Sequence, residues 1–254
     1  MKFNTVLIAT VILVVTCFIS LPCQPVQALG DVQIVSHSSF YNSLDTLYVV
    51  GELENTGDVA TEFTKVTATF YGSDNQVIDT SIGYSTLDVL LPGRKSPFAV
   101  MLLQDDGAMD VYNYTLSVSW QEYDEDKPIG LEILSSEESV DVLDCLHITG
   151  EIKNTADSNA NSVMVCATFY DSTGTVVGRS WEYADPSDMA PNQTGTFDVQ
   201  LIYEEQIEKV ASYSLSAESE EYSVIPEFPT GLTMIVAIAS IAVAVAIYKN
   251  KLKD

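Results

Sequence analysis

The chain has few of the residues that usually carry catalysis or nucleic-acid binding. Its 254 residues include two histidines, four cysteines, and 11 Lys and Arg against 36 Asp and Glu, a formal net charge of −25. Residues 29–229 hold seven basic and 35 acidic side chains, a net charge of −28. Such a surface repels phosphate groups, so we expect no nucleic-acid partner. It suits solubility, a salty exterior or cation-rich surroundings.

Catalytic motifs are also missing from the sequence. It has no nucleophile-elbow serine, no phosphate-cradling glycine loop and no His/Cys cluster with metal-ligand spacing. His37 and His147 do not occupy equivalent positions in the repeat described next. Acidic pairs are inevitable among so many carboxylates, and nothing in the sequence gives two of them contrasting environments. We therefore expect a non-catalytic protein.

The centre of the chain is a repeat. Gly51–Tyr71 (GELENTGDVATEFTKVTATFY) returns 99 residues later as Gly150–Tyr170 (GEIKNTADSNANSVMVCATFY). The same offset relates other pairs, namely Asp45/Asp144, Tyr84/Tyr183, Pro92/Pro191, Phe98/Phe197 and Tyr114/Tyr213. No residue is inserted or deleted between the copies, so we predict two units, residues 29–120 and 129–219. The acidic linker 121–128 is short, and we expect the units to lie end to end.

Period-two alternation in these units predicts β-strands. Thr46–Asn55 places Leu47, Val49 and Leu53 on one face, and Phe63–Tyr71 alternates in the same way. Asn55–Asp58 has turn chemistry, so we interpret Gly51–Tyr71 as a hairpin. Six or seven short strands per unit predict an all-β protein with two tandem immunoglobulin-like β-sandwich domains.

Both ends of the chain carry targeting signals. Residues 1–28 have a positive start, an apolar core and a small-residue site before Leu29, which is typical of a secretory signal peptide; an uncleaved anchor is the alternative. Residues 230–248 are long and apolar enough for one C-terminal transmembrane helix. The lysines of the tail 249–254 place that end in the cytoplasm. We therefore expect a cell-membrane protein whose bulk is extracellular.

The run LYVVGELENTG…VTATFY…LLPGRKSPF resembles the FxLYD-type domain, a small extracellular β-sandwich of prokaryotic surface proteins. The second copy, LHITGEIKNTA…VCATFY…MAPNQTGTF, resembles it with a weaker turn. The resemblance covers nearly all of residues 31–219. It is carried by strand and turn residues, so it implies a fold and a location but no active site.

The stalk at 220–229, the apolar segment and the lysines together resemble the three-part tails of archaeal surface proteins. In some such families a membrane-embedded sorting enzyme recognises the tail and cuts near a Pro-Glu-Phe motif. The resemblance implies that Pro226, Glu227 and Phe228 are the recognition residues. A proline-stiffened stalk above an ordinary membrane helix is the alternative.

Cys145 and Cys166 are the cysteines that remain after leader removal. They replace Thr46 and Thr67 of the first unit, at outward positions on what we interpret as neighbouring antiparallel strands. An oxidising exterior favours a disulfide between them, if the hairpin register brings their Cα atoms within about 7 Å. Two free thiols are the alternative.

Two further kinds of surface site are predicted. The linker carboxylates offer clustered oxygen ligands for calcium, although no calcium-loop spacing is present and a solvated charge run is the alternative; they are Glu122, Asp124, Glu125 and Asp126. Asn113 and Asn192 begin glycosylation sequons, and Asn192, in a predicted loop, is the better acceptor.

We expect this protein to display two β-sandwich repeats for surface structure or for contact with other cell-envelope proteins. The alternative is a receptor-like ectodomain that binds a ligand or ion and serves another membrane protein. The outward strand faces, rich in Thr, Tyr and Val, are ordinary strand surface or a partner-binding face; they hold Thr46, Tyr48, Val50, Thr67, Thr69 and Tyr71.

Overall fold

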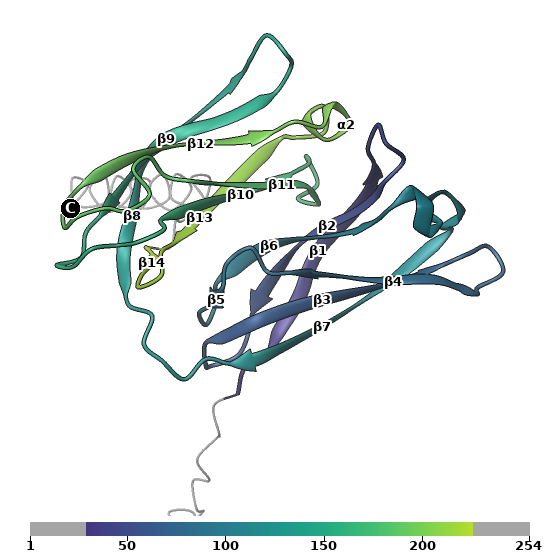
Figure 1. The fold of residues 1–254 in the computed structure, drawn as a ribbon, viewed down its shortest axis with the longest axis horizontal. Coiled ribbons are helices and arrows are strands. Elements are labelled where there is room, and N and C mark those ends of the chain that lie inside the picture. Colours follow the sequence, from purple (N-terminus) through teal and green to yellow (C-terminus); the bar gives the residue numbers. More distant parts are fainter. Residues whose placement is uncertain (1–28, 226–254) are drawn as a thin grey trace, which may run out of the picture.

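The computed structural model describes residues 29–225, and this part consists mainly of β-strands, which confirms the all-β prediction (Figure 1). The first unit contains strands β1 (Val32–Tyr41), β2 (Leu47–Asn55), β3 (Thr61–Tyr71), β4 (Val77–Tyr84), β5 (Val89–Leu90), β6 (Lys95–Leu102) and β7 (Asn113–Glu122). Two short 3₁₀ turns, η1 (Gln104–Asp106) and η2 (Ala108–Asp110), connect β6 to β7.

The second unit repeats this order. It contains β8 (Ile129–Val140), β9 (Leu146–Asn154), β10 (Met164–Tyr170), β11 (Val176–Tyr183), β12 (Thr194–Leu201), the one-turn helix α2 (Glu204–Ile207), β13 (Ser212–Glu218) and β14 (Ser223–Val224). Strand β14 pairs with β13 and, in parallel, with β8. The segment predicted as a stalk therefore begins inside the second unit.

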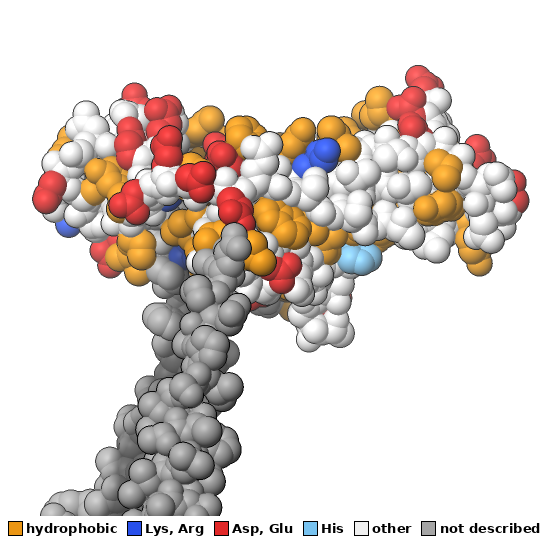
Figure 2. Space-filling view, turned by 90° about the horizontal axis from the view of Figure 1, so that it is seen from below, with side chains coloured by type: hydrophobic (Ala, Val, Ile, Leu, Met, Phe, Trp, Pro, Cys, Tyr) orange, Lys and Arg blue, Asp and Glu red, His pale blue; other side chains and the backbone are white. Residues whose placement is uncertain are grey.

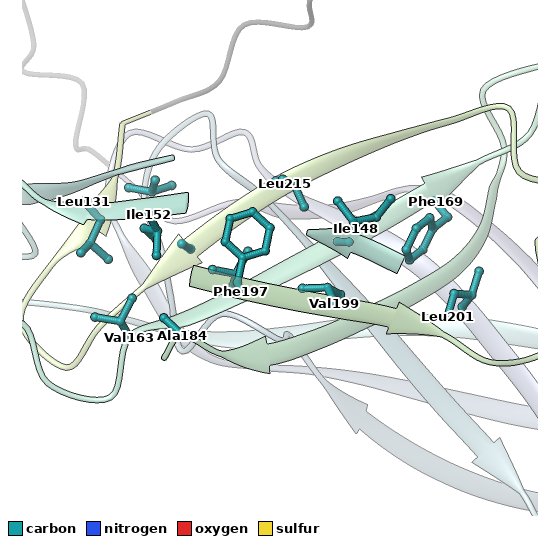
Figure 3. Packing of buried hydrophobic residues seen from close by; sticks show 14 of the residues in the cluster. Leu131, Ile148, Ile152, Val163, Phe169, Ala184, Phe197, Val199, Leu201 and Leu215 are labelled. Carbon is teal, nitrogen blue, oxygen red and sulfur yellow. The ribbon is translucent and has the colours of Figure 1, made fainter. Parts of the chain in front are cut away.

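In each unit, two layers of strands enclose an apolar core. In the first unit β1-β2-β6 covers a layer of β4, β3, β5 and β7. In the second unit β11-β10-β13 and β8-β9-β12 are joined through β14. Val66, Ala68 and Phe70, which form one face of the predicted strand Phe63–Tyr71, are fully buried. Figure 3 shows the matching core of the second unit between its strands.

The interpretation of Gly51–Tyr71 as a hairpin is wrong. Strand β2 pairs with β1 and β6, whereas β3 pairs with β4, β5 and β7. The connection instead crosses from one layer to the other around the buried Asn55, whose Nδ2 donates to the carbonyl oxygens of Val59 (2.8 Å) and Leu90 (2.7 Å). Asn154 makes the same two bonds, to Ser158 and Met189, so the recurring Asn fixes this crossing in both copies.

The recurring glycine has a packing reason. A Cβ on Gly51 would lie 2.5 Å from the ring of Phe98 on β6 and 2.6 Å from the carbonyl oxygen of Ser36, which lies at a bulge in β1. Gly150 meets Phe197 and Ser135 in the same way. The repeated motif therefore records a strand crossing and a close approach of backbone to ring.

From the short linker we expected the two units to lie end to end, and this expectation is wrong. Strands β1 and β2 of the first unit lie beside β11 of the second, and the units pack side by side (Figure 1). The reason is that the outer face of β2 is apolar enough to require a cover, as shown below. Within residues 29–225 no helix is long and apolar enough to cross a membrane. The predicted signal peptide, transmembrane segment and Pro226-Glu227-Phe228 motif lie outside the described residues.

Candidate functional site

The most extensively built feature outside the two cores is the junction between the units. Phe40 and Val50 of the first unit and Val176 of the second form a buried apolar cluster. Tyrosines from both units surround it: Phe40 stacks on Tyr48 with ring centroids 5.2 Å apart, and Tyr203 packs against both rings. Burial of these side chains is the apolar contribution to docking of the units.

Hydrogen bonds across the junction satisfy the backbone at the start of β11. Ser38 Oγ donates to the carbonyl oxygen of Val176 at 2.6 Å, and the Val176 amide donates to Ser36 Oγ at 2.9 Å. Because a buried backbone group without a partner costs free energy, these two serines let the start of an edge strand be covered by the other unit.

A carboxylate of the first unit is buried beside this cluster. Glu52 is 2% exposed, lies 3.1 Å from Lys95 Nζ and accepts a hydrogen bond from the Tyr170 hydroxyl of the second unit. Burial, with the neighbouring Glu52 charge, raises the pKa of Tyr170, so the phenol keeps the proton that it donates.

A carboxylate of the second unit makes the reverse contact. Glu218 on β13 is 5% exposed and accepts hydrogen bonds from the backbone amides of Asp88 and Val89 in the first unit. Its cationic partner, Lys127 of the linker, is 3.8 Å away and donates to the carbonyl oxygens of Ser219 and Glu220. Burial raises the pKa of Glu218 to about 7, because these contacts do not fully replace the lost water.

Two guanidinium groups line the same interface. Arg94 Nη2 donates to Ser216 Oγ across the junction at 3.2 Å. Burial lowers the pKa of Arg94 and of Arg179, and raises the pKa of the Cys166 thiol, which lies near both, to about 12. Cys166 is 1% exposed and packs with the core cluster of the first unit, so its side chain is an interface residue.

This position of Cys166 removes the basis of the predicted disulfide. Cys145 immediately precedes β9, in the β8-β9-β12 layer, whereas Cys166 lies on β10 in the opposite layer. Both are free thiols in the structure. The prediction rested on a hairpin between their strands, and these strands do not pair.

The outward faces of β2 and β3, predicted to be ordinary strand surface or a partner-binding face, have different surroundings. Thr46 and Val50 are buried, Val50 in the junction cluster, while Thr67, Thr69 and Tyr71 on β3 stay half-exposed. In the second unit the counterpart of Tyr48 is His147, which lies between two carboxylates. Its Nδ1 is 2.8 Å from Asp198 and its Nε2 is 3.5 Å from Asp141. The hydrogen bond with Asp198 is the main reason that the pKa of His147 is raised.

The other predicted surface sites are accessible. Glu122, Asp124, Glu125 and Asp126 are all exposed, and within residues 29–225 no group of three or more His, Cys, Asp or Glu side chains could hold a metal ion. The structure thus gives the calcium hypothesis no geometric support. Asn113, at the start of β7, and Asn192, in the turn before β12, are both exposed.

Sequence reasoning missed the polar residues of the junction: Glu52, Arg94, Lys127 and Glu218. One signal was available in the copies themselves, because Phe40 and Val50 are matched by Ser139 and Thr149. A face that is apolar in one copy and polar in the other indicates burial in the first.

No family model and no curated protein matches this chain. Among solved structures, red sea bream transglutaminase is 8% identical with a TM-score of 0.24, over 81% of this chain and 32% of that one. An exo-chitosanase of Amycolatopsis orientalis is 11% identical with a TM-score of 0.27, over 74% and 26%. Bacteroides uniformis β-glucuronidase 2 is 10% identical with a TM-score of 0.25, over 77% and 31%. This chain spans about a third or less of those proteins, and such distant likenesses carry no inference about function.

Proposed function

We propose that this protein is a membrane-anchored cell-surface protein whose two units are tandem immunoglobulin-like β-sandwiches. They serve surface structure and contact with other envelope proteins, and the protein is non-catalytic. The leader exports the chain, the apolar segment 230–248 anchors it, and residues 29–225 stand outside the membrane.

The observation that carries this proposal is the buried junction. The apolar cluster of Phe40, Val50 and Val176, together with hydrogen bonds in both directions, fixes one unit against the other. A spacer or contact module needs a fixed shape, and a buried, hydrogen-bonded contact supplies it. The acidic side chains spread over the surface in Figure 2 favour a soluble, exposed location.

A second candidate, the ligand-binding ectodomain, is favoured by one observation. The first unit has a hollow of about 300 Å³ lined by Thr64 and Ser85, whose hydroxyl oxygens have no hydrogen-bond partner within the described part of the chain.

The test is protease treatment of intact cells that make the full-length chain with an epitope after Asp254. We expect residues 29–225 to be degraded, while the epitope fragment survives until the cells are opened. Full protection of residues 29–225 would contradict the proposed location. Proximity labelling on the same cells then separates the two candidates: varied envelope neighbours support the structural role, and a single transporter or enzyme supports the receptor role.

A further inference from the structure

We propose that the first unit has a binding site for an alkylammonium group, in the hollow between the start of β3 and the loop after β4. The lining residues are Glu62, Phe63, Thr64, Tyr84, Ser85, Leu87 and Asp88. This inference does not depend on the membrane anchor, because it rests only on residues of the first unit.

Two unpartnered hydroxyls are the first evidence. Thr64 is 2% exposed, and neither its Oγ1 nor the buried Ser85 Oγ has a hydrogen-bond partner among residues 29–225. A buried hydroxyl that lacks a partner costs free energy, so such a group needs an explanation. Thr64 and Ser85 both line the hollow, and each hydroxyl oxygen, although covered in the unliganded structure, has acceptor capacity that an N–H donor could use.

The second unit provides an internal control at the same fold positions. Val163 replaces Thr64 and Ala184 replaces Ser85, and both lie in the apolar core, side by side in Figure 3. The backbone is alike, since the Ser85 amide donates to the Thr64 carbonyl just as the Ala184 amide donates to that of Val163. The fold therefore accepts apolar side chains here, and the hydroxyls of the first unit are not required by the backbone.

The residues at the rim of the hollow also differ between the two units. In the second unit Asn161 and Ser162 occupy the positions of Glu62 and Phe63, and their side chains bond to Glu221 and Glu220. In the first unit Glu62 and Asp88 form no ion pair with any residue in the range 29–225. The rim that is internally satisfied in one unit is open and anionic in the other.

Aromatic rings complete the site. Phe63 is 63% exposed and Tyr84 is 54% exposed, although both are large side chains. Phe63 has a φ of 47° and Ser162 one of 54°, so the left-handed backbone belongs to the shared fold, but only the first unit places an aromatic ring there. Aromatic faces attract cations and pack against alkyl chains. Carboxylates, hydroxyl acceptors and aromatic rings together match a primary ammonium on a short alkyl chain.

The test is amide NMR of the full-length protein in detergent micelles, with n-butylammonium as the probe for a free amine and N-acetyl-lysine amide as the probe for a protein lysine. We expect saturable shifts of resonances near Thr64 and Ser85, and about tenfold weaker binding in Thr64→Val/Ser85→Ala. That variant should also be more stable, which separates loss of the site from loss of the fold. The matched control, Val163→Thr/Ala184→Ser, should lose stability and gain no binding.

Each outcome of these titrations either supports the proposed site or contradicts it. Binding of the lysine probe alone would support the site and assign it to a protein side chain. Binding of n-butanol as strongly as n-butylammonium would overturn the requirement for charge. Equal affinity in Thr64→Val/Ser85→Ala, or no saturable shift with either ammonium probe, would overturn the proposal.

Discussion

The outer faces of β2 in the first unit and β9 in the second derive from the same repeat but have different surroundings. On β2 the face presents Tyr48, Val50 and Glu52, and it is covered by the second unit. On β9 the equivalent residues are His147, Thr149 and Glu151, and they remain half-buried or exposed. The other layers differ in the opposite direction: Cys166 and Thr168 on β10 are buried, whereas Thr67 and Thr69 on β3 are half-exposed.

This difference shows how two copies of one fold came to use opposite outer faces for their contact. Each unit uses one outer face for the junction, and on the two faces left over the equivalent positions hold Thr67, Thr69, Thr149 and Glu151. Terminal repeats of stacked arrays need polar outer faces to stay soluble. Within residues 29–225, the apolar outer face of β2 is therefore covered by the second unit, and its counterpart on β9 holds polar residues.

The largest expected loss of stability tests what the copies share. Asn55→Ala removes the amide that donates to the carbonyl oxygens of Val59 and Leu90 and the oxygen that accepts from the Gly57 amide, so one buried and two half-buried backbone groups each lose a hydrogen bond. We expect a loss of about 3 kcal/mol or more in the free energy of unfolding, measured with urea. Asn154→Ala should cost a similar amount. A loss below about 1 kcal/mol in either variant would show that the crossing does not depend on this side chain.

The next largest effect on stability depends on pH and comes from Glu218. Only the second unit has a carboxylate at this position, because the counterpart in the first unit is Ser119. The raised pKa of Glu218, about 7, means that its stabilising contribution is complete below about pH 4.5 and is lost as pH rises through 7. We therefore expect Glu218→Gln to be more stable than the wild type at pH 8.5, by about 1–3 kcal/mol, with the difference disappearing near pH 5.

Thermal unfolding across this pH range measures the effect of Glu218→Gln. Glu221→Gln, at a carboxylate that bonds Asn161 within the second unit, is the matched control. A less stable Glu218→Gln protein at pH 8.5 would mean that the ion pair with Lys127 outweighs the cost of burial, and would contradict our explanation.

A smaller effect follows from exchanging the two faces directly. Val50→Thr gives the junction the residue of the exposed face, and burial of the hydroxyl in the apolar cluster should cost about 1–2 kcal/mol. Thr149→Val makes the reverse change on the free face and should alter stability by less than about 0.5 kcal/mol. Equal effects of the two substitutions in urea unfolding would remove the distinction between the faces.

The smallest effect concerns His147, the counterpart of Tyr48. Its raised pKa, caused mainly by Asp198, gives a stabilisation that is complete below about pH 6.5 and declines as pH rises above its folded-state pKa. Because the charged partners are partly exposed, we expect less than about 1 kcal/mol. The melting temperature of His147→Gln should fall below that of the wild type at pH 5.5 and approach it at pH 8.5. The opposite trend would contradict a stabilising role for protonated His147.

Much of the fold could be predicted because alternation is local. The positions of Val66, Ala68 and Phe70 give their burial directly, and the predicted strands Thr46–Asn55 and Phe63–Tyr71 are present as β2 and β3. The pairing of β2 could not be predicted, because it depends on Asn55 reaching Leu90, 35 residues away. The short turn sequence after Asn55 suits a hairpin equally well.

The junction could not be predicted for a similar reason. Lys127 and Glu218 are 91 positions apart and form an ion pair only after both units have folded. Val50 and Thr149 both alternate outward, and sequence periodicity does not say which outward face another unit covers. Only the comparison of the copies carries that information, since one face keeps apolar residues that the other has replaced.

The fixed packing of the units can be tested by pulsed electron paramagnetic resonance on the full-length protein in detergent. Spin labels are placed at Ser73→Cys and Ser172→Cys, two exposed turn positions on different units, in a Cys145→Ser background. We predict one narrow distance distribution, which broadens when Val50→Thr weakens the junction. A broad or multimodal distribution in the protein without that substitution would contradict the rigid junction on which the proposed role depends.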